Sequence, residues 1–325
     1  RRPVEAIRRL EQGASRDDVK PRGTAAVIDA SFDVKQGEIF VVMGLSGSGK
    51  STLIRMLNGL WKPTAGHVLL GGTDLAQADA KQMRALRRKH VSMVFQHFAL
   101  LPHRTVLDNA AYPLEIQGVG KAERREKART ALGLVGLGGW EDSLPSQLSG
   151  GMRQRVGLAR ALAADTDVLL MDEAFSALDP LIRREMQEQL LELQQTLGKT
   201  IVFITHDLNE AMHLGDRIAV MRDGRIVQIG TAEQILSDPA NDYVAQFVAD
   251  VDRTRVLTAS SVMVRPAVVV PLSGGPRQAS RTMREAQVSA AYGVDRQRRL
   301  QGVVRDEDAV AAPGAATQLR APETR

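Results

Sequence analysis

The sequence contains no cysteine among its 325 residues, which excludes disulfide bonds and metal sites built from thiolates. It also lacks any apolar run that approaches the roughly 20 residues of a membrane-spanning helix. The first twelve residues alternate charged and apolar side chains, unlike the apolar core of a signal peptide. We therefore expect a cytosolic chain that could still bind a membrane protein.

Lysine is missing from residues 251–325, although this stretch holds 12 arginines against seven acidic residues, a net charge of +5. Residues 1–250 carry 31 basic and 31 acidic side chains, so the whole excess lies in the C-terminal stretch. This shift predicts a separate block that begins near residue 250. An apolar content of 43% is typical of a globular protein, and the length allows more than one domain.

The clearest motif is a glycine-rich loop at 44–52 with the pattern G-x-x-x-x-G-K followed by Ser. An apolar run at 39–43 precedes it and a segment with helical spacing follows, which disfavours the alternative of a flexible glycine-serine turn. Such a loop points its N–H groups at a phosphate, and the helix dipole favours the same anion. We expect Lys50 to reach the β- and γ-phosphates and Ser51 to bind Mg²⁺. The phosphate-binding residues are Gly44, Leu45, Ser46, Gly47, Ser48, Gly49, Lys50, Ser51 and Thr52.

Polar side chains directly follow three other apolar runs that the sequence predicts to be strands. Because the carboxyl ends of parallel strands meet at one edge of an α/β sheet, we expect these side chains to line a ligand crevice. They are Gln96 after 91–95, Asp172 and Glu173 after 167–171, and His206, preceded by Thr205, after 200–204.

Each of these polar side chains has a predicted role and a plainer alternative. Asp172 is expected to bind Mg²⁺, and Glu173 to orient or deprotonate a water that attacks the γ-phosphate, the alternative being an acidic pair that caps a helix. Gln96 is expected to hold Mg²⁺ or the attacking water, although strand-end glutamines are commonly surface residues. His206 is expected to contact the γ-phosphate, although strand-end histidines are commonly structural.

A second anion site is indicated where Ser149 precedes Gly150 and Gly151 at the start of a helical pattern. Ser149 is placed as an N-cap, and the glycines leave the first N–H groups of the helix open. The site has no lysine, and alone it is a common helix start.

Weaker patterns predict the remaining elements. We expect a short amphipathic helix or a frayed terminus at 3–19, strands at 26–34 and 67–70, a basic helix face at 84–90, a helix at 122–134, a hairpin at Asp223-Gly224, and helices at 181–197 and 231–248. The loop that follows Gln96 holds an apolar patch of four residues, which either fills the core or docks a partner. They are Phe98, Leu100, Leu101 and Pro102.

The order and spacing of six elements over residues 20–250 resemble the ATP-binding subunit of an ABC transporter. They are the phosphate loop at 44–52, the Q-loop at Gln96, the signature at 148–152 with Met152 in place of the usual Gln, the Walker B strand and catalytic Glu at 168–173, the D-loop at 176–179, and the switch histidine His206. The resemblance implies a P-loop NTPase fold of the α/β class, with a RecA-like core sheet, an antiparallel β subdomain and a helical subdomain at about 97–160. It also adds Asp179 to the nucleotide-binding residues.

The resemblance further implies how the protein works and what it binds. Two copies would pack head to tail on ATP and Mg²⁺, each signature capping the γ-phosphate held by Lys50 of the partner subunit, and hydrolysis would release them. An integral-membrane permease would be the direct partner, and an extracytoplasmic solute-binding protein an indirect one. The subunit would then sit peripherally on the cytoplasmic face of the inner or plasma membrane.

Three segments look most like importers of glycine betaine, proline and related osmoprotectants, namely 42–52, 172–183 and 238–244. A soluble ABC ATPase acting on nucleic acid or ribosomes is the alternative. It is disfavoured because the chain has one ATPase core, no long coiled-coil insertion and no net charge over residues 1–250, so no nucleic-acid partner is expected. A purely regulatory subunit is disfavoured because Lys50, Asp172, Glu173 and His206 are all present.

The chain departs from its apparent family at two places besides Met152. Where many ABC ATPases have an aromatic residue that stacks on adenine, this chain has Lys20, Pro21, Arg22 and Gly23, which leaves Arg22 or no strong partner. Residues 255–310 look like a single CBS motif with no second copy, and 311–325 read as a disordered tail. The expected domains are thus 1–20, 21–250, 255–310 and 311–325. The arginine-rich tail either binds an anionic membrane surface or is a solvated basic surface.

Overall fold

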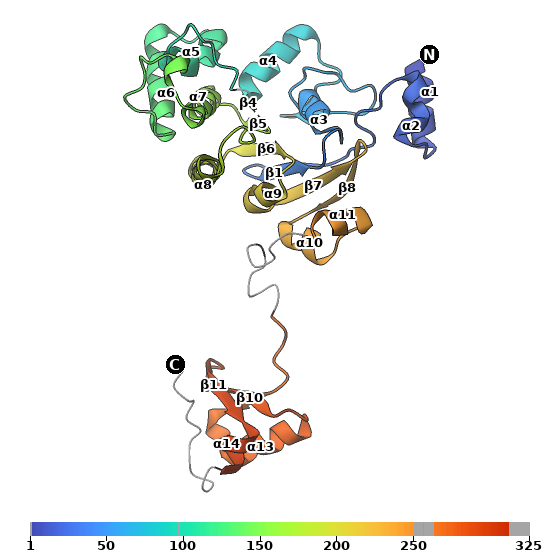
Figure 1. Ribbon diagram of the computed structural model, residues 1–325, viewed down its shortest axis with the longest axis vertical. Helices are drawn as coiled ribbons and strands as arrows, with labels where there is room; N and C mark the ends of the chain where they lie inside the picture. Colours follow the sequence, from blue (N-terminus) through green and yellow to red (C-terminus); the bar gives the residue numbers. More distant parts are fainter. Residues whose placement is uncertain (1, 97, 250–255, 257–262, 312–325) are drawn as a thin grey trace. The chain divides into compact units, whose positions relative to one another are not determined.

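The computed structural model describes residues 2–96, 98–249, 256 and 263–311. The chain forms two compact units, Arg1–Leu257 and Thr258–Arg325 (Figure 1). Their boundary lies close to the position at which the charge of the sequence changes. Every helix among the described residues is too short or too polar to cross a membrane.

A six-stranded sheet forms the centre of the first unit, in the order β4-β5-β6-β1-β7-β8. The first five strands in this order are parallel, and β8 returns antiparallel to β7. The hairpin predicted from Asp223-Gly224 and the α/β class predicted for the core are therefore confirmed. The strands are β1 (Ile39–Met43), β4 (Val91–Phe95), β5 (Val168–Asp172), β6 (Thr200–Thr205), β7 (Arg217–Arg222) and β8 (Arg225–Gly230).

The central strands β1 and β6 are buried along their whole length because both faces of the sheet are covered, and their residues are apolar except for the threonines at the two ends of β6. Along β1, Ile39, Val41 and Met43 join one buried cluster, whereas Phe40 and Val42 join the cluster on the opposite face. Helices supply the other side of each cluster. They are α3 (Lys50–Leu57) on the face of Phe40, and α8 (Pro180–Leu197) and α9 (Leu208–Leu214) on the face of Val41.

A group of helices lies beside the β4 edge of the sheet, drawn in green in Figure 1. Its members pack on one another, and the last of them also packs on β4. They are α5 (Val106–Gln117), α6 (Lys121–Leu134) and α7 (Gly150–Ala163). The helix predicted at 122–134 is confirmed by α6, and the basic face predicted at 84–90 lies on α4 (Ala80–His90).

Four predictions for the first unit need correction. The strand predicted at 26–34 is wrong: the segment has no strand ladder, and its alternation instead reflects burial of Ile28, whose N–H donates to the Gly224 carbonyl (2.7 Å). The helix predicted at 3–19 is broken after Glu11, because Gly13 adopts a φ of 88° and Ser15 caps a new turn. The strand at 67–70 and the helix at 231–248 are shorter than predicted. The observed elements are α1 (Arg2–Glu11), α2 (Arg16–Val19), β2 (Leu69–Leu70), β3 (Thr73–Asp74), α10 (Ala232–Ser237) and α11 (Asp242–Phe247).

The second unit holds a three-stranded sheet in the order β11-β10-β9. Its small core includes Val270, Met283 and Val304, which come from a strand, a helix and another strand. The elements are β9 (Val269–Pro271), α13 (Gly275–Glu285), β10 (Ala290–Val294), β11 (Leu300–Arg305) and α14 (Asp306–Ala311). From residue 312 onward, the predicted disordered tail lies outside the described residues.

Candidate functional site

The register of the core sheet places the predicted site residues at one edge. Phe95 pairs with Asp172, Asp172 with Ile204, and Thr205 with Met43, so these strands end at the same level. The residues that follow the strand ends therefore share this edge: Gly44, Gln96, Glu173 and His206. The structure thus brings together the phosphate loop and the polar strand-end residues, as the sequence predicts.

The loop between β1 and α3 has a backbone that only glycine can adopt at certain positions. Gly44 and Gly49 have φ values of 153° and 108°. A Cβ at Gly44 would lie 2.3 Å from the Met221 carbonyl oxygen, and one at Gly49 would lie 2.3 Å from the Ala26 carbonyl oxygen. The loop is therefore closely backed by other backbone segments, which fixes its curl. The buried Ser48 hydroxyl has no hydrogen-bond partner in the described part of the chain.

Lys50 is buried at the start of α3 and folds back into the curl of the loop. Its Nζ donates to the Gly44 carbonyl (2.7 Å) and the Leu45 carbonyl (3.2 Å). Burial lowers the pKa of Lys50, while the nearby Glu173 and Asp172 carboxylates oppose this shift. A cation thus sits where the loop and the helix N-terminus would hold a phosphate.

Asp172 ends β5 beside this cation. Burial and the charge of Glu173 raise the pKa of Asp172, whereas Arg55, Lys50 and a hydrogen bond with the Ser51 hydroxyl oppose the rise. The Asp172 carboxylate and the Ser51 hydroxyl are oxygen donors of the kind that Mg²⁺ prefers. Among the described residues, no group of three or more His, Cys, Asp or Glu side chains could hold a metal ion.

Glu173 and His206 face each other across the ends of β5 and β6. His206 Nδ1 lies 3.2 Å from Glu173 Oε2, and the histidine side chain is 55% exposed whereas that of Glu173 is 21% exposed, so the pair opens to solvent on the histidine side. Glu173 has a φ of 47°, a strained value for a residue with a side chain. Its N–H donates to the Ile204 carbonyl (2.9 Å), and its own carbonyl accepts from the Ser176 hydroxyl (2.8 Å). The turn thus fixes the direction of the carboxylate.

Gln96 follows β4 and is half-buried at the same edge. Within the described part of the chain, its side-chain amide makes no hydrogen bond, so the structure shows its place but no contact with Asp172. The loop beyond it is held by α7, because Arg160 donates to the carbonyls of Phe98 (3.1 Å) and Ala99 (2.6 Å). Both of those residues have positive φ values.

The apolar patch after Gln96 is divided between the core and the surface. Phe98 and Leu100 pack against the main core, as core filling requires. A groove of about 360 Å³ lies close by, between α4, β4, α5 and α7. The apolar side chains exposed along it are Phe95 and Ile116, and no pattern in the sequence marks their exposure.

The signature residues form a second cluster at the start of α7. The Ser149 hydroxyl accepts from the Met152 N–H (3.2 Å), so Ser149 is the N-cap that the sequence predicts. A Cβ at Gly151 would lie 2.5 Å from a methyl carbon of Ile182, so the start of α7 packs closely on the start of α8. Asp179 is the N-cap of α8.

This second cluster is separate from the phosphate loop. In the part of the chain that the structure describes, no hydrogen bond or ion pair joins Ser149, Gly150, Gly151 or Asp179 to residues 44–52. One predicted partner for adenine cannot be placed, since the side chain of Arg22 lies outside the described residues. The sequence reasoning also missed Arg16, whose guanidinium donates to the Gly47 carbonyl (2.8 Å).

Comparison with known proteins gives consistent matches. A family model described as ABC transporter matches residues 27–176. The glycine betaine transport ATP-binding protein OpuAA of Bacillus subtilis is 56% identical over 306 residues, which cover 94% of this chain and 73% of that protein. The glycine betaine/proline betaine transport system ATP-binding protein ProV of Salmonella typhimurium is 49% identical over 324 residues, or 98% of this chain and 81% of that protein.

A solved structure extends the likeness to three dimensions. It is the dimeric post-hydrolysis state of an ATP-binding cassette bound to ADP and Pi, with a TM-score of 0.59 and 35% identity. The match covers 64% of this chain and 90% of that cassette.

The geometry of the loop predicts that its glycines differ in tolerance to substitution. Gly49→Ala brings a methyl group against the Ala26 carbonyl, whereas the methyl group of Gly47→Ala meets open space. Both positions have positive φ, so both variants are strained by about 1–2 kcal/mol, but only Gly49→Ala must also move the loop. We expect Gly49→Ala to weaken the binding of a nucleoside triphosphate at least about tenfold more than Gly47→Ala does. Titration with a fluorescent analogue measures this, and equal losses would contradict the close backing of the loop.

Proposed function

The chain belongs to the ABC transporter ATP-binding family, and we propose that it powers an importer of glycine betaine, proline or a related quaternary amine. As a member of this family, it is an ATPase. The proposed solute rests on relatives that are named for glycine betaine transport, among them the two reported above at identities of 49% and 56%. A soluble ABC ATPase that acts on nucleic acid or ribosomes is not favoured, because these relatives are transport proteins.

The observation that carries the catalytic proposal is the placement of Glu173 and His206 beside Lys50 and Asp172. The loop N–H groups and Lys50 would bind the β- and γ-phosphates of ATP. Glu173 would accept a proton from the attacking water, and His206, 3.2 Å from that carboxylate, would contact the γ-phosphate. Mg²⁺ would be held by Ser51, Asp172 and Gln96, and would neutralise phosphate charge.

The second cluster supports a reaction shared between two copies of the chain. Ser149 caps α7 by accepting from the Met152 N–H, which leaves the N–H groups of Gly150 and Gly151 without an intrahelical partner, and no lysine of the described chain bonds to this helix start. We propose that Ser149, Gly150, Gly151 and Asp179 complete the site of a partner subunit in a head-to-tail homodimer. The similar solved cassette is itself dimeric. ATP would thus join the two copies, and hydrolysis would release them.

The groove between α4, β4, α5 and α7 is the proposed docking place for a membrane permease. Phe95 and Ile116 expose apolar side chains there, and Arg160 lines the groove while it holds the loop after Gln96. A segment of the permease bound in this groove would therefore contact Arg160, and through it the loop that follows Gln96 in the chain. An extracytoplasmic solute-binding protein would act indirectly. The subunit would lie on the cytoplasmic face of the membrane.

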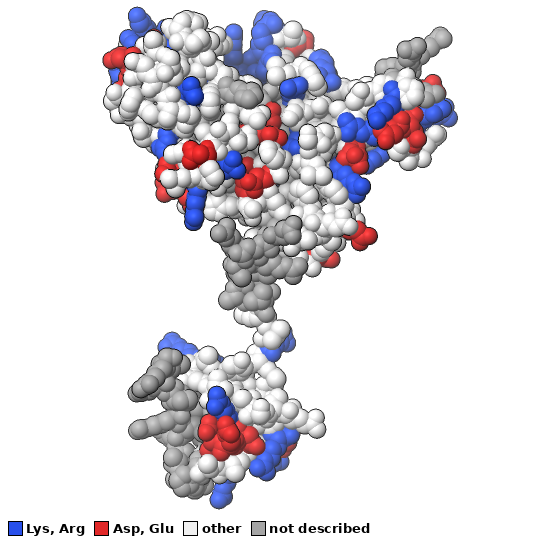
Figure 2. All heavy atoms as spheres, viewed as in Figure 1, with Lys and Arg blue, Asp and Glu red and all other residues white. Residues whose placement is uncertain are grey.

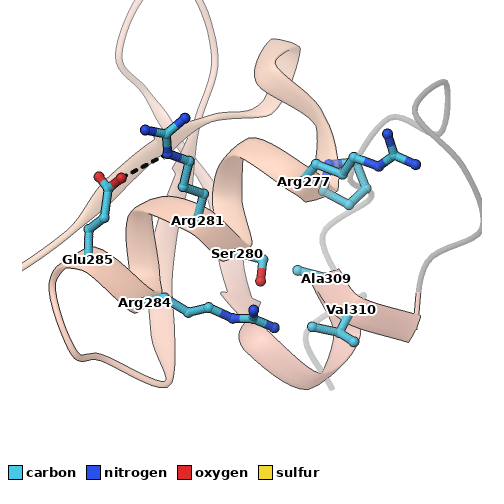
Figure 3. Close-up of a pocket in the computed structure, with 8 residues that line it drawn as sticks. Arg277, Ser280, Arg281, Arg284, Glu285, Ala309 and Val310 are labelled. Atoms are coloured by element: carbon cyan, nitrogen blue, oxygen red, sulfur yellow. Dashed lines mark hydrogen bonds and ion pairs between the residues drawn. The ribbon is translucent and has the colours of Figure 1, made fainter.

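For the second unit we propose a lone CBS-like fold and contact with an anionic membrane surface. Arg277, Arg281 and Arg284 of α13 line a pocket of about 510 Å³ (Figure 3). Arg281 is paired with Glu285 (2.8 Å), and Figure 2 shows acidic groups between the basic ones on the visible face of this unit. Attraction to an anionic membrane surface would therefore depend on Arg277, Arg281 and Arg284. The proposed domains remain 1–20, 21–250, 255–310 and a tail at 311–325.

Glu173→Gln removes the proposed proton acceptor with little change in shape. We expect ATP hydrolysis to fall about 10²- to 10⁴-fold while ATP binding is kept, so that closed dimers accumulate. Phosphate release and size-exclusion chromatography with magnesium and ATP measure the two effects. Glu192→Gln, on an exposed position of α8, is the matched control. Unchanged turnover in Glu173→Gln would remove Glu173 from its proposed role.

Lys50→Ala removes the buried cation from the curl of the loop. We expect ATP affinity to fall at least about tenfold, since a charge-assisted contact to the phosphates is lost. Calorimetric titration measures the affinity. Lys199→Ala is the control for net charge, because Lys199 is paired with Asp165 (2.8 Å), away from the loop. Equal affinity in Lys50→Ala and the unaltered chain would count against the phosphate cradle.

Membrane contact is tested by sedimentation with vesicles that contain phosphatidylglycerol. We expect binding that weakens as salt rises, because each basic residue near the surface contributes about 1 kcal/mol and salt screens it. Replacing Arg277, Arg281 and Arg284 by Gln should abolish most of this binding, as should removal of residues 251–325. Equal sedimentation of all three proteins would end the proposal.

A further inference from the structure

Two turns carry the proposed catalytic pair, and they come from different parts of the chain. Glu173 opens the turn that leads from β5 to α8, and His206 lies in the turn that leads from β6 to α9. Among the described residues, the two side chains meet through His206 Nδ1 and Glu173 Oε2, and the histidine side of this contact is 55% exposed. A contact with one solvent-exposed partner contributes little to holding the two side chains in a fixed geometry. Another interaction must therefore fix the position of one turn relative to the other.

Arg183, in the first turns of α8, reaches back to the Glu173 turn. One guanidinium nitrogen, Nη2, donates to the Ser176 carbonyl (3.3 Å) and to the Leu178 carbonyl (3.1 Å). The Ser176 N–H and hydroxyl in turn donate to the Glu173 carbonyl (3.1 and 2.8 Å). Arg183 is thus linked, through Ser176, to the residue whose backbone is strained.

The other guanidinium nitrogen of Arg183 reaches the His206 turn. Nη1 lies 3.4 Å from Asp207 Oδ2, and both side chains are about two-thirds buried. The other oxygen of Asp207 accepts from the Glu210 N–H (3.1 Å) and caps α9, while the Asp207 N–H donates to the Thr205 hydroxyl (2.9 Å). Asp207 is therefore fixed on three sides, and it directly follows His206.

We propose that Arg183 is a positioning residue, a guanidinium brace that sets Glu173 and His206 against each other. The inference rests on the roles proposed above for those two residues. A planar guanidinium presents several donors in a fixed fork, so it can bind two turns at once. A lysine ammonium is a single point of charge and cannot span the same acceptors in this way.

The neighbouring arginine gives the matched control. Arg184 is exposed on the same helix and makes no hydrogen bond or ion pair among the described residues. Arg184→Gln therefore changes net charge and helix composition as Arg183→Gln does, without touching either turn.

Steady-state ATP hydrolysis and ATP binding, measured on the full chain, separate positioning from folding. We expect Arg183→Gln to lower kcat about ten- to a hundredfold, the range for lost charge-assisted hydrogen bonds, and to leave the Kd for ATP within about twofold. Arg183→Lys should recover part of kcat, and Arg184→Gln should match the unaltered chain. A role in stability alone would instead lower the melting temperature and ATP affinity together.

Asp207→Asn provides a test that does not depend on the folding of Arg183→Gln. Asn remains a good N-cap for α9 but removes the carboxylate that Arg183 contacts. We expect a lower kcat with unchanged Kd, and we expect Arg183→Gln/Asp207→Asn to be no slower than Arg183→Gln, because the two residues act through one contact. Losses that multiply in the double variant would overturn the brace.

Two further outcomes are decisive. A full kcat in folded Arg183→Gln or in Asp207→Asn, together with an inactive Glu173→Gln, would overturn this inference and leave the proposed function intact. An active Glu173→Gln would instead overturn the proposed function, whatever Arg183 does.

Discussion

The structure depends on an ammonium group held inside a glycine loop and faced by carboxylates at the same edge of a sheet. Burial lowers the pKa of Lys50 and raises that of Asp172, so each charge is costly alone and is favoured by the other. The loop can pack against the Met221 and Ala26 carbonyls only because Gly44 and Gly49 lack a Cβ, and in the curl so formed the Gly44 carbonyl accepts from Lys50. Charge, loop curvature and strand register therefore form one constraint, and a phosphate is the ligand that fits it.

The same edge stores backbone strain, and the strain is confined to turns. Glu173, Phe98 and Ala99 all have positive φ, and each lies just beyond the end of a core strand. Arginine side chains meet the carbonyls of these turns, Arg160 after β4 and Arg183 after β5. The guanidinium groups of Arg160 on α7 and Arg183 on α8 thus hold the strained turns in place. This fixes the orientation of the polar side chains that these turns carry.

Much of the sheet edge could be predicted because its cause is local. An apolar run followed by a polar residue marks a strand end, and this pattern located Gln96, Asp172, Glu173 and His206 correctly in space. The prediction of a strand at 26–34 was wrong for a related reason. Alternation of apolar and polar residues indicates burial of one side of a segment, and Ile28 is buried although the segment pairs with no strand of the described chain. The contacts of Arg183 could not be predicted, since bonds from a guanidinium to distant carbonyls leave no pattern in the sequence.

The two clusters of predicted site residues lead to the last step. A helix start with open N–H groups suits an anion, and the loop around Lys50 suits the same anion, yet no hydrogen bond or ion pair within the described chain joins them. The close packing of Gly151 on Ile182 fixes the direction of the α7 start, so this helix cannot turn toward its own loop without breaking that contact. The open helix start therefore suits a phosphate held by another copy. In the proposed dimer each copy would supply one half of the site, so that a single ligand would satisfy both anion sites.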